Sequence, residues 1–497
     1  MKGDFTRVTF KKSNRYSGVL MQQGRVQLDS DLNENHLITE HQIRSLAADL
    51  IGPYGGPKTN NGFRIFNDGI GGDFFIGPGH YYVDGILCEH DPDVMVISKS
   101  SASQSGDTLI LSIPSLTLDE RQLIDNDWLE VMDSNGTWWP AQVTAVDLKN
   151  GTFSLKKTGQ TPVRIRRLLT FLNQQDNPGA KMISGDFLAY LDVWERHITC
   201  LDDQNIREVA LGGPDTSTRA KVVWQVNLMA AQGCEDINKL QPLCNAWMRA
   251  RLNPTDPSSD PCIVAPNSKY RGAENLFYRV EIHSVETNRE GQVEWTFKWS
   301  NQNGSIEAIQ LGSTEDGGLI VNSTRGFSAG QWVEITHEAD ELQNKPGKLV
   351  KIARVDADAI YLEPNPGGSA KSMWKLRRWD QRPVGDTELS EGAVKGKEGE
   401  WLDLENGIQV YFETGGTYCP GTYWYFPARV ATGQIQWPLE LDLDGQPRTD
   451  VNGNEIARAL APHGIQHHYA PLAMLTLNGN DLVINSDCRD SFTFKTD

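Results

Sequence analysis

Most of the chain alternates apolar and polar residues over short runs that glycine, proline and asparagine separate. This alternation has the two-residue period of a β-strand with one buried face. The run 185–199 shows it well, because Phe187, Ala189, Leu191 and Val193 all fall on one face. The pattern predicts a mainly β, multidomain protein.

One part of the pattern occurs twice along the chain. Four segments of a first copy match four segments of a second copy, at offsets between 204 and 211 residues. The matched pairs are 128–131 with 332–335, 143–147 with 352–356, 153–155 with 360–362, and 165–167 with 376–378. Each copy alternates over three or four short strands, which is typical of a small antiparallel sheet or barrel. The repeat predicts two similar small β modules inserted in a larger β scaffold.

The first fifty residues have a different pattern, which predicts an N-terminal extended segment followed by a helix. Between residues 16 and 28, apolar residues fall in alternating pairs around Gly24. Asp31 then stands where a helix N-cap belongs, with Glu34 as its capping-box partner. Gly52-Pro53 ends the helix. One stripe of this helix carries the apolar residues Leu32, Ile43, Leu46, Leu50 and Ile51.

Several motifs carry a resemblance to a known family. The segments 3–7 and 16–29 resemble the start of a family of long bacterial proteins encoded among genes for phage-tail-like contractile injection systems. Three further blocks match this family, namely 190–197, 270–283 and 464–473. The core formed by Gly24-Arg25 and Asn33-Glu34 also resembles the N-terminal docking segment of some phage baseplate and tail-fibre proteins. The resemblance implies a structural part of an injection particle, without enzymatic activity.

The N-terminal segment is therefore the predicted docking site, at or around the baseplate. An extended segment rich in Gln and Gly can pair with a partner sheet through backbone hydrogen bonds. The predicted contact residues are Tyr16, Gln22, Gln23, Gly24, Arg25, Asp29, Asn33 and Glu34. The expected neighbours are other baseplate, spike or sheath-associated subunits, and symmetric copies of this chain that form a homo-oligomeric ring. The alternative is that the segment folds entirely within its own chain.

These patterns divide the chain into six predicted regions. They are 1–52 (docking segment and helix), 53–102 (β meander), 103–173 (first β module), 174–300 (central β scaffold), 301–383 (second β module) and 384–497 (C-terminal β scaffold).

Composition narrows the function classes. The formal charge of −18 argues against nucleic acid as a partner, because binding to phosphates needs clustered Lys and Arg. No apolar run approaches the roughly 20 residues that a membrane-spanning helix needs, so no direct membrane span is expected. Seven cysteines predict reduced, buried thiols, with Cys234, Cys244 and Cys262 among them. We expect synthesis in the cytoplasm and incorporation into a particle that is released or membrane-associated.

The chain offers few candidates for bound metal. His463, His467 and His468 are its densest group of imidazoles, but nearby prolines argue against the helix that a zinc site at this spacing needs. The turns at 442–445 and 450–455 resemble fragments of calcium loops and are more typical of Asp-Gly and Asn-Gly turns. We therefore expect no metal and no cofactor.

Two alternative functions remain, and each depends on particular side chains. A tailspike-like glycan-degrading enzyme needs a pair of placed carboxylates, and Glu195 and Glu274 are the candidates beside aromatic residues. Both also fit structural ion pairs, which is the interpretation that the sequence favours. A glycan-binding adhesin would instead bind through exposed aromatic side chains of the two modules without cleavage.

Overall fold

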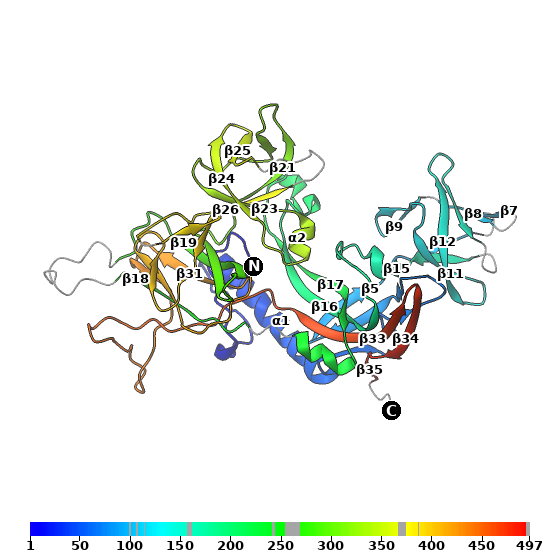
Figure 1. The fold of residues 1–497 in the computed structure, drawn as a ribbon, viewed down its shortest axis with the longest axis horizontal. Helices are drawn as coiled ribbons and strands as arrows, with labels where there is room; N and C mark the ends of the chain where they lie inside the picture. Colours follow the sequence, from blue (N-terminus) through cyan, green and yellow to red (C-terminus); the bar gives the residue numbers. More distant parts are fainter. Residues whose placement is uncertain are drawn as a thin grey trace. The chain divides into compact units, whose positions relative to one another are not determined.

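The computed structural model describes residues 1–98, 101–105, 108–113, 115–156, 162–240, 244–253, 269–365, 374–385 and 387–493. Within these residues the chain consists mainly of β-strands in several sheets, which confirms the predicted mainly β, multidomain fold (Figure 1). Contacts divide the chain into two compact units. The first unit comprises Met1–Thr39, Glu195–Lys221 and Pro242–Gln466, and the second comprises Glu40–Trp194, Val222–Gln241 and His467–Asp497.

The β meander belongs to the second unit and contains two small sheets. One sheet has the order β35-β1-β4-β5 and the other has the order β15-β3-β2. Their strands are β1 (Tyr54–Pro57), β2 (Ile65–Phe66), β3 (Phe75–Ile76), β4 (Gly79–Val83), β5 (Ile86–His90), β15 (Leu169–Thr170) and β35 (Ser491–Phe492). Asp84 and Gly85 join β4 to β5 with φ angles of 48° and 78°, the left-handed pair that a tight hairpin turn favours.

The first β module is a seven-stranded sheet of the order β6-β14-β11-β12-β13-β8-β7, with the hairpin β10-β9 beside it in the chain. The strands are β6 (Met95–Val96), β7 (Ala102–Ser105), β8 (Thr108–Ser112), β9 (Thr117–Leu118), β10 (Arg121–Gln122), β11 (Trp128–Met132), β12 (Trp138–Asp147), β13 (Thr152–Lys156) and β14 (Arg164–Arg167). Its core is aliphatic around Phe153, with Leu129, Val143 and Ile165 all buried.

The second β module, in the first unit, is a closed barrel of the order β21-β22-β25-β24-β23-β26. Its strands are β21 (Glu307–Ser313), β22 (Leu319–Val321), β23 (Trp332–Thr336), β24 (Lys348–Val355), β25 (Ala359–Glu363) and β26 (Lys375–Trp379). The short helix α2 (Glu338–Leu342) follows β23.

The two modules share strand order and register, which confirms the repeat. The order β14-β11-β12-β13 of the first matches β26-β23-β24-β25 of the second. The β-bulge between Val143 and Ala145 recurs between Ile352 and Arg354, at the predicted offset of 209. The modules differ at the edge, because β21 pairs with both β22 and β26 and so closes the second module into a barrel.

The larger scaffold contributes three more sheets. A four-stranded sheet has the order β17-β16-β33-β34, a six-stranded sheet has the order β27-β28-β20-β19-β31-β32, and a three-stranded sheet has the order β18-β30-β29. The strands of the four-stranded sheet are β16 (Gly185–Ile198), β17 (Arg219–Ala230), β33 (His468–Asn478) and β34 (Asp481–Asp487). The others are β18 (Met248–Leu252), β19 (Leu276–Thr287), β20 (Val293–Ser300), β27 (Leu389–Ser390), β28 (Ala393–Lys395), β29 (Trp401–Asp403), β30 (Ile408–Phe412), β31 (Tyr423–Arg429) and β32 (Gln434–Ile435).

The core residues of these sheets follow from the alternation in the sequence. Phe187, Ala189, Leu191 and Val193 of β16 are fully buried in one apolar cluster, as their common face predicts. In the first unit the six-stranded and three-stranded sheets share an aromatic core around Trp295. Period-two patterning therefore places the scaffold cores correctly.

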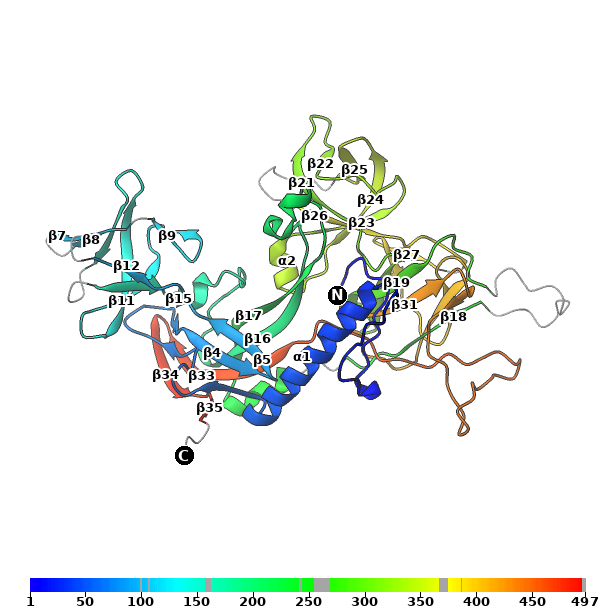
Figure 2. The ribbon, with the colours of Figure 1, turned by 180° about the vertical axis from the view of Figure 1, so that it is seen from behind.

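The long helix α1 (Asp29–Ile51) follows the N-terminal segment (Figure 2). It begins at Asp29, two residues before the predicted N-cap at Asp31. Ser30 and Ile38 are its buried residues. Within the second unit, Gly85 lies so close to α1 that a Cβ there would be 2.1 Å from the carbonyl oxygen of Arg44, so only glycine permits this approach.

Candidate docking site at the N-terminal arm

Residues 10–28, named the arm below, form a projecting loop in the first unit. The arm contains one short 3-10 helix, η1 (Lys12–Asn14), and no strand. It reverses direction where the Arg25 N–H donates to the Gln22 carbonyl oxygen at 3.4 Å, with Gly24 at a φ of 70°. The extended segment predicted for residues 16–28 is therefore a loop with a turn, and it forms no sheet with the described part of its own chain.

The residues before the arm are fixed on the scaffold of the first unit. The Lys2 ammonium lies 3.1 Å from a Glu281 carboxylate oxygen. The Gly3 N–H donates to the Asn303 carbonyl oxygen at 3.3 Å, and the Asn303 side chain donates to the Gly3 carbonyl oxygen at 2.9 Å. The arm therefore starts from a fixed point.

The first turns of α1 fix the base of the arm. The Asp29 carboxylate accepts hydrogen bonds from the Thr6 N–H at 2.9 Å and from the Thr6 hydroxyl at 2.5 Å. Partial burial by itself raises the pKa of Asp29, but these hydrogen bonds outweigh it and lower the pKa below its ordinary value. Glu34 accepts from the Thr9 hydroxyl at 2.6 Å. Two of the predicted contact residues, Asp29 and Glu34, thus bind within their own chain.

Asn35 supplies a third fixed point, because its side-chain oxygen accepts from the Val19 N–H at 3.1 Å. The remaining predicted contact residues are exposed, and they are Tyr16, Gln22, Gln23, Gly24, Arg25 and Asn33.

The arm presents large apolar side chains to solvent. Leu20 is 90% exposed, Val26 is 84% exposed and Tyr16 is 60% exposed. Met21 and Leu28 are exposed as well. A single exposed apolar residue is ordinary on a protein surface, whereas five within 19 residues of one loop make that loop a candidate contact surface. The predicted contact set omitted Leu20 and Val26. Val26 lies between Arg25 and Gln27 and so stands out in the sequence, whereas Leu20 lies between Val19 and Met21 and does not.

The apolar stripe predicted for α1 is present but is not buried. Leu32, Ile43, Leu46 and Leu50 are all exposed, while Ile51, the fifth residue predicted for the stripe, is half-buried. Their spacing of 11, 3 and 4 residues places them on one face of a 3.6-residue helix, and the buried Ile38 lies on the other side. The stripe is thus a second exposed apolar feature near the arm in sequence.

The three histidines do not converge on a metal. His467 Nδ1 lies 2.6 Å from an Asp192 carboxylate oxygen, and its ring stacks on Trp194 at 4.9 Å. His468 Nδ1 lies 2.7 Å from an Asp84 carboxylate oxygen. His463 belongs to the other unit, where it stacks on Tyr425. In the parts of the chain that the structure describes, no group of three His, Cys, Asp or Glu residues is suited to hold a metal.

The prediction of reduced thiols is wrong for four cysteines. Cys234 is disulfide-bonded to Cys488 and Cys244 to Cys419, each with a Cα–Cα distance of 5.8 Å. The partners lie 254 and 175 residues apart in sequence, so only the fold brings them together. Cys262 lies outside the described residues, while Cys88 and Cys200 are free and buried.

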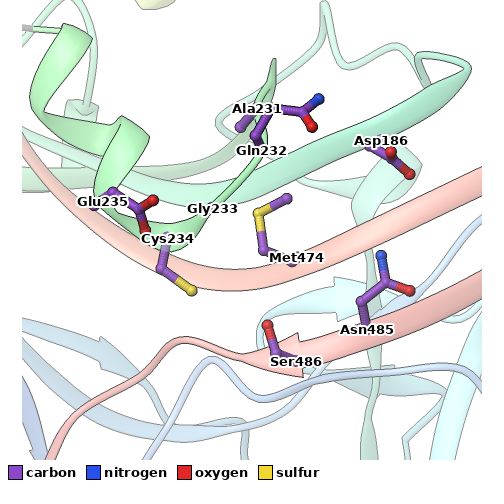
Figure 3. Close-up of a pocket in the computed structure, with 9 residues that line it drawn as sticks. All are labelled: Asp186, Ala231, Gln232, Gly233, Cys234, Glu235, Met474, Asn485 and Ser486. Carbon is purple, nitrogen blue, oxygen red and sulfur yellow. The ribbon is translucent and has the colours of Figure 1, made fainter.

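A polar pocket of about 460 Å³ lies in the second unit, between the end of β17 and the strands β33 and β34 (Figure 3). Its Asp186 carboxylate accepts from the Thr476 hydroxyl at 2.6 Å, and Asn485 donates to that hydroxyl oxygen at 2.8 Å. Met474 lies between the polar groups of the two sides. The pocket's Asp186 and Asn485 are thus tied together through Thr476, in a network that stabilises the local fold.

The carboxylates proposed for glycan cleavage lie on different elements. Glu195 is half-buried on β16, while Glu274 is exposed before β19. The neighbouring Arg196 pairs with Asp202 at 3.1 Å and with Glu341 at 2.8 Å. This ion-pair network ties β16 to α2 and has a structural role.

The calcium-like fragments form ordinary turns. Asp442 accepts from the backbone N–H groups of Asp444 and Gln446, and Asp450 accepts from those of Asn452 and Asn454. These are side-chain-capped turns of the kind that Asp favours.

Comparison with known proteins assigns the chain to a family. Residues 1–143, 174–247 and 242–490 match a family of unknown function, DUF6519, and the chain belongs to this family. No curated protein matches the chain. None of the helices that the structure describes is both long and apolar enough to cross a membrane.

Proposed function

We propose that this protein is a structural subunit of a contractile, phage-tail-like injection particle, located at or around the baseplate, and that the arm docks it to a neighbouring subunit. The resemblance of its N-terminal segment and three further blocks to proteins of such systems supports the particle assignment. The exposure of Leu20, Val26 and Tyr16 on a loop with fixed ends is the observation that carries the docking assignment.

Docking would gain free energy from the burial of apolar side chains of the arm and from backbone hydrogen bonds to a partner. The N–H and C=O groups of the arm form no ladder within the described residues of the chain, so they can pair with a partner's sheet edge. Each large apolar side chain that becomes fully buried contributes about 1.5–3 kcal/mol before the costs of ordering. In a symmetric assembly several arms bind at once, so their combined avidity exceeds the affinity of one arm.

The test is a pair of substitutions confined to the arm. Deletion of residues 1–52 would remove Lys2, Gly3 and the buried Ile38 together with the arm. A loss of particle incorporation could then result from misfolding as well as from the loss of docking. The variant Leu20→Ser/Val26→Ser changes only exposed side chains, and its free energy of unfolding should stay within about 0.5 kcal/mol of the parent. We expect this variant to be lost from purified particles.

A matched control uses the same substitutions elsewhere in the first unit. Val209 and Leu211 of η5 (Val209–Leu211) are 84% and 71% exposed, so Val209→Ser/Leu211→Ser removes similar exposed apolar surface without touching the arm. This control should enter particles normally. Normal incorporation of the arm variant would refute the docking function, and glycan binding or cleavage by the isolated chain would favour an adhesin or a tailspike enzyme instead.

A further inference from the structure

The arm differs in charge from the rest of the protein. Residues 10–28 contain four basic side chains and no acidic one, so the remaining chain has 43 Lys and Arg against 65 Asp and Glu. The four basic residues are Lys11, Lys12, Arg15 and Arg25, and all are exposed. Within the described residues their side chains form no ion pair or hydrogen bond. A charge of +4 thus projects from a chain whose remainder carries −22.

A second projection of the first unit, residues 438–458, has the opposite charge. It is named the double hairpin here, because two successive turns fold it back on itself (drawn in orange below β18 in Figure 1). Bridges join Leu439 to Ala457, Leu441 to Pro447 and Thr449 to Glu455. Five acidic and two basic residues give it a net charge of −3.

Each turn of the double hairpin carries one aliphatic side chain at its tip. Leu443 is 105% exposed and Val451 is 101% exposed, and the two positions are eight residues apart in two similar turns. The Asp442 and Asp450 carboxylates hold these turns by accepting two backbone N–H groups each. The double hairpin therefore presents two aliphatic tips, each next to an acidic residue of its own turn, Asp444 beside Leu443 and Asp450 beside Val451.

We propose that the arm of one copy of this chain binds the double hairpin of a second copy. The two surfaces are complementary, because each combines exposed aliphatic side chains with a net charge, which is +4 on the arm and −3 on the double hairpin. Both surfaces are exposed in the single chain, with Leu20 and Leu443 almost fully in solvent, so they do not bind each other within one copy. This inference rests on the proposed docking function and names the neighbour that the arm contacts.

Charge reversal on each side provides the test. The arm-reversed variant combines Lys11→Glu, Lys12→Glu, Arg15→Glu and Arg25→Glu. The hairpin-reversed variant combines Asp444→Lys and Glu455→Lys, whose carboxylates are exposed and do not cap the turns. Self-association of the full chain is measured by analytical ultracentrifugation at about 0.05 M and about 0.5 M salt. The screening length shortens as the ionic strength rises, so attraction between opposite charges is weaker at the higher salt concentration.

The expected results follow from complementarity. The parent chain should self-associate more weakly at high salt, and each reversed variant alone should lose at least about tenfold in association constant. A mixture of the two reversed variants should regain association, because the arm of each variant then meets a hairpin of opposite charge on the other variant. Failure of the mixture to associate better than either variant alone would overturn the proposal, as would a parent chain that stays monomeric at low salt.

Particle incorporation separates this inference from the proposed function. If the parent chain is monomeric while the arm-reversed variant fails to enter particles, the arm docks on a different protein, so the second-copy assignment is wrong and the docking function stands. If the arm-reversed variant enters particles normally, the docking function itself is wrong.

Discussion

Replacement of Lys298 by Met tests how the second module is held on its scaffold. Lys298 of β20 lies 2.6 Å from a Glu334 carboxylate oxygen of β23 and 3.3 Å from Glu281 of β19. These side chains are 2–4% exposed. Burial by itself raises the pKa of Glu334, but the ammonium groups of Lys298 and, after it, Lys2 outweigh burial and hold that pKa at about 2. Met retains the length and volume of the Lys stem while removing its charge.

The expected loss is about 3 kcal/mol in the free energy of unfolding. Removal of one partner from a buried ion pair costs roughly 3–5 kcal/mol, because the other charge remains without compensation. The lower end applies here, since Glu334 still accepts from Trp379 Nε1 at 2.9 Å and from the Gly347 N–H at 3.0 Å. Glu281 also keeps its Arg279 partner at 2.7 Å.

Urea unfolding followed by the summed fluorescence of the 14 tryptophans measures this loss. Lys395→Met is the matched control in the same sheet, because Lys395 forms an exposed pair with Glu388 and should cost less than about 0.5 kcal/mol. Adding Glu334→Gln to Lys298→Met should restore part of the stability. A loss below about 1 kcal/mol for Lys298→Met would refute the reasoning.

Two further predictions concern protonation and oxidation. Burial, reinforced by the nearby Lys298 ammonium, lowers the pKa of His283 to about 4. As the pH falls, His283 is therefore protonated in the unfolded chain before it is protonated in the folded one. The free energy of unfolding then decreases as the pH drops from 6.5 towards 4. His283→Gln should therefore reduce the stability loss between pH 7 and pH 5 by about 2 kcal/mol in urea titrations, and an unchanged loss would contradict the shift. Peptide mass mapping without reductant should show Cys234 joined to Cys488 and Cys244 joined to Cys419. Alkylation of all seven cysteines in unreduced, denatured protein would exclude these bonds.

The sequence predicts much of the fold, because alternation and repetition are local properties. The matched segments specify which strands correspond, and the pairing of Val131 with Ile165 recurs between Ile335 and Leu376 at the predicted offsets. What each module contacts depends on the whole fold. Glu130 pairs with Arg166 of its own module, whereas the equivalent Glu334 pairs with Lys298 of the scaffold. No spacing in the sequence distinguishes these two environments.

The same limit explains the errors at the cysteines and at the start of α1. An odd number of cysteines at wide spacing predicts free thiols. The disulfide partners, however, are 254 and 175 residues apart in sequence, and only the packing of the sheets brings them together. Asp31 and Glu34 have the spacing of a capping box, yet α1 begins at Asp29. The Asp29 carboxylate binds Thr6, a residue that the local pattern does not connect to the helix.

These contacts at the base of the arm bear on how the proposed docking site would bind a partner. Asp29 and Glu34 hold Thr6 and Thr9, so both ends of the arm are fixed, and Asn35 holds Val19 in the middle of the arm. A loop with fixed ends loses less conformational entropy on binding than a free tail of the same length, and more of the burial energy then appears as affinity. Asp29 and Glu34 are thus positioning residues that hold the arm, while Leu20, Val26 and the four basic side chains supply the surface that a partner would cover.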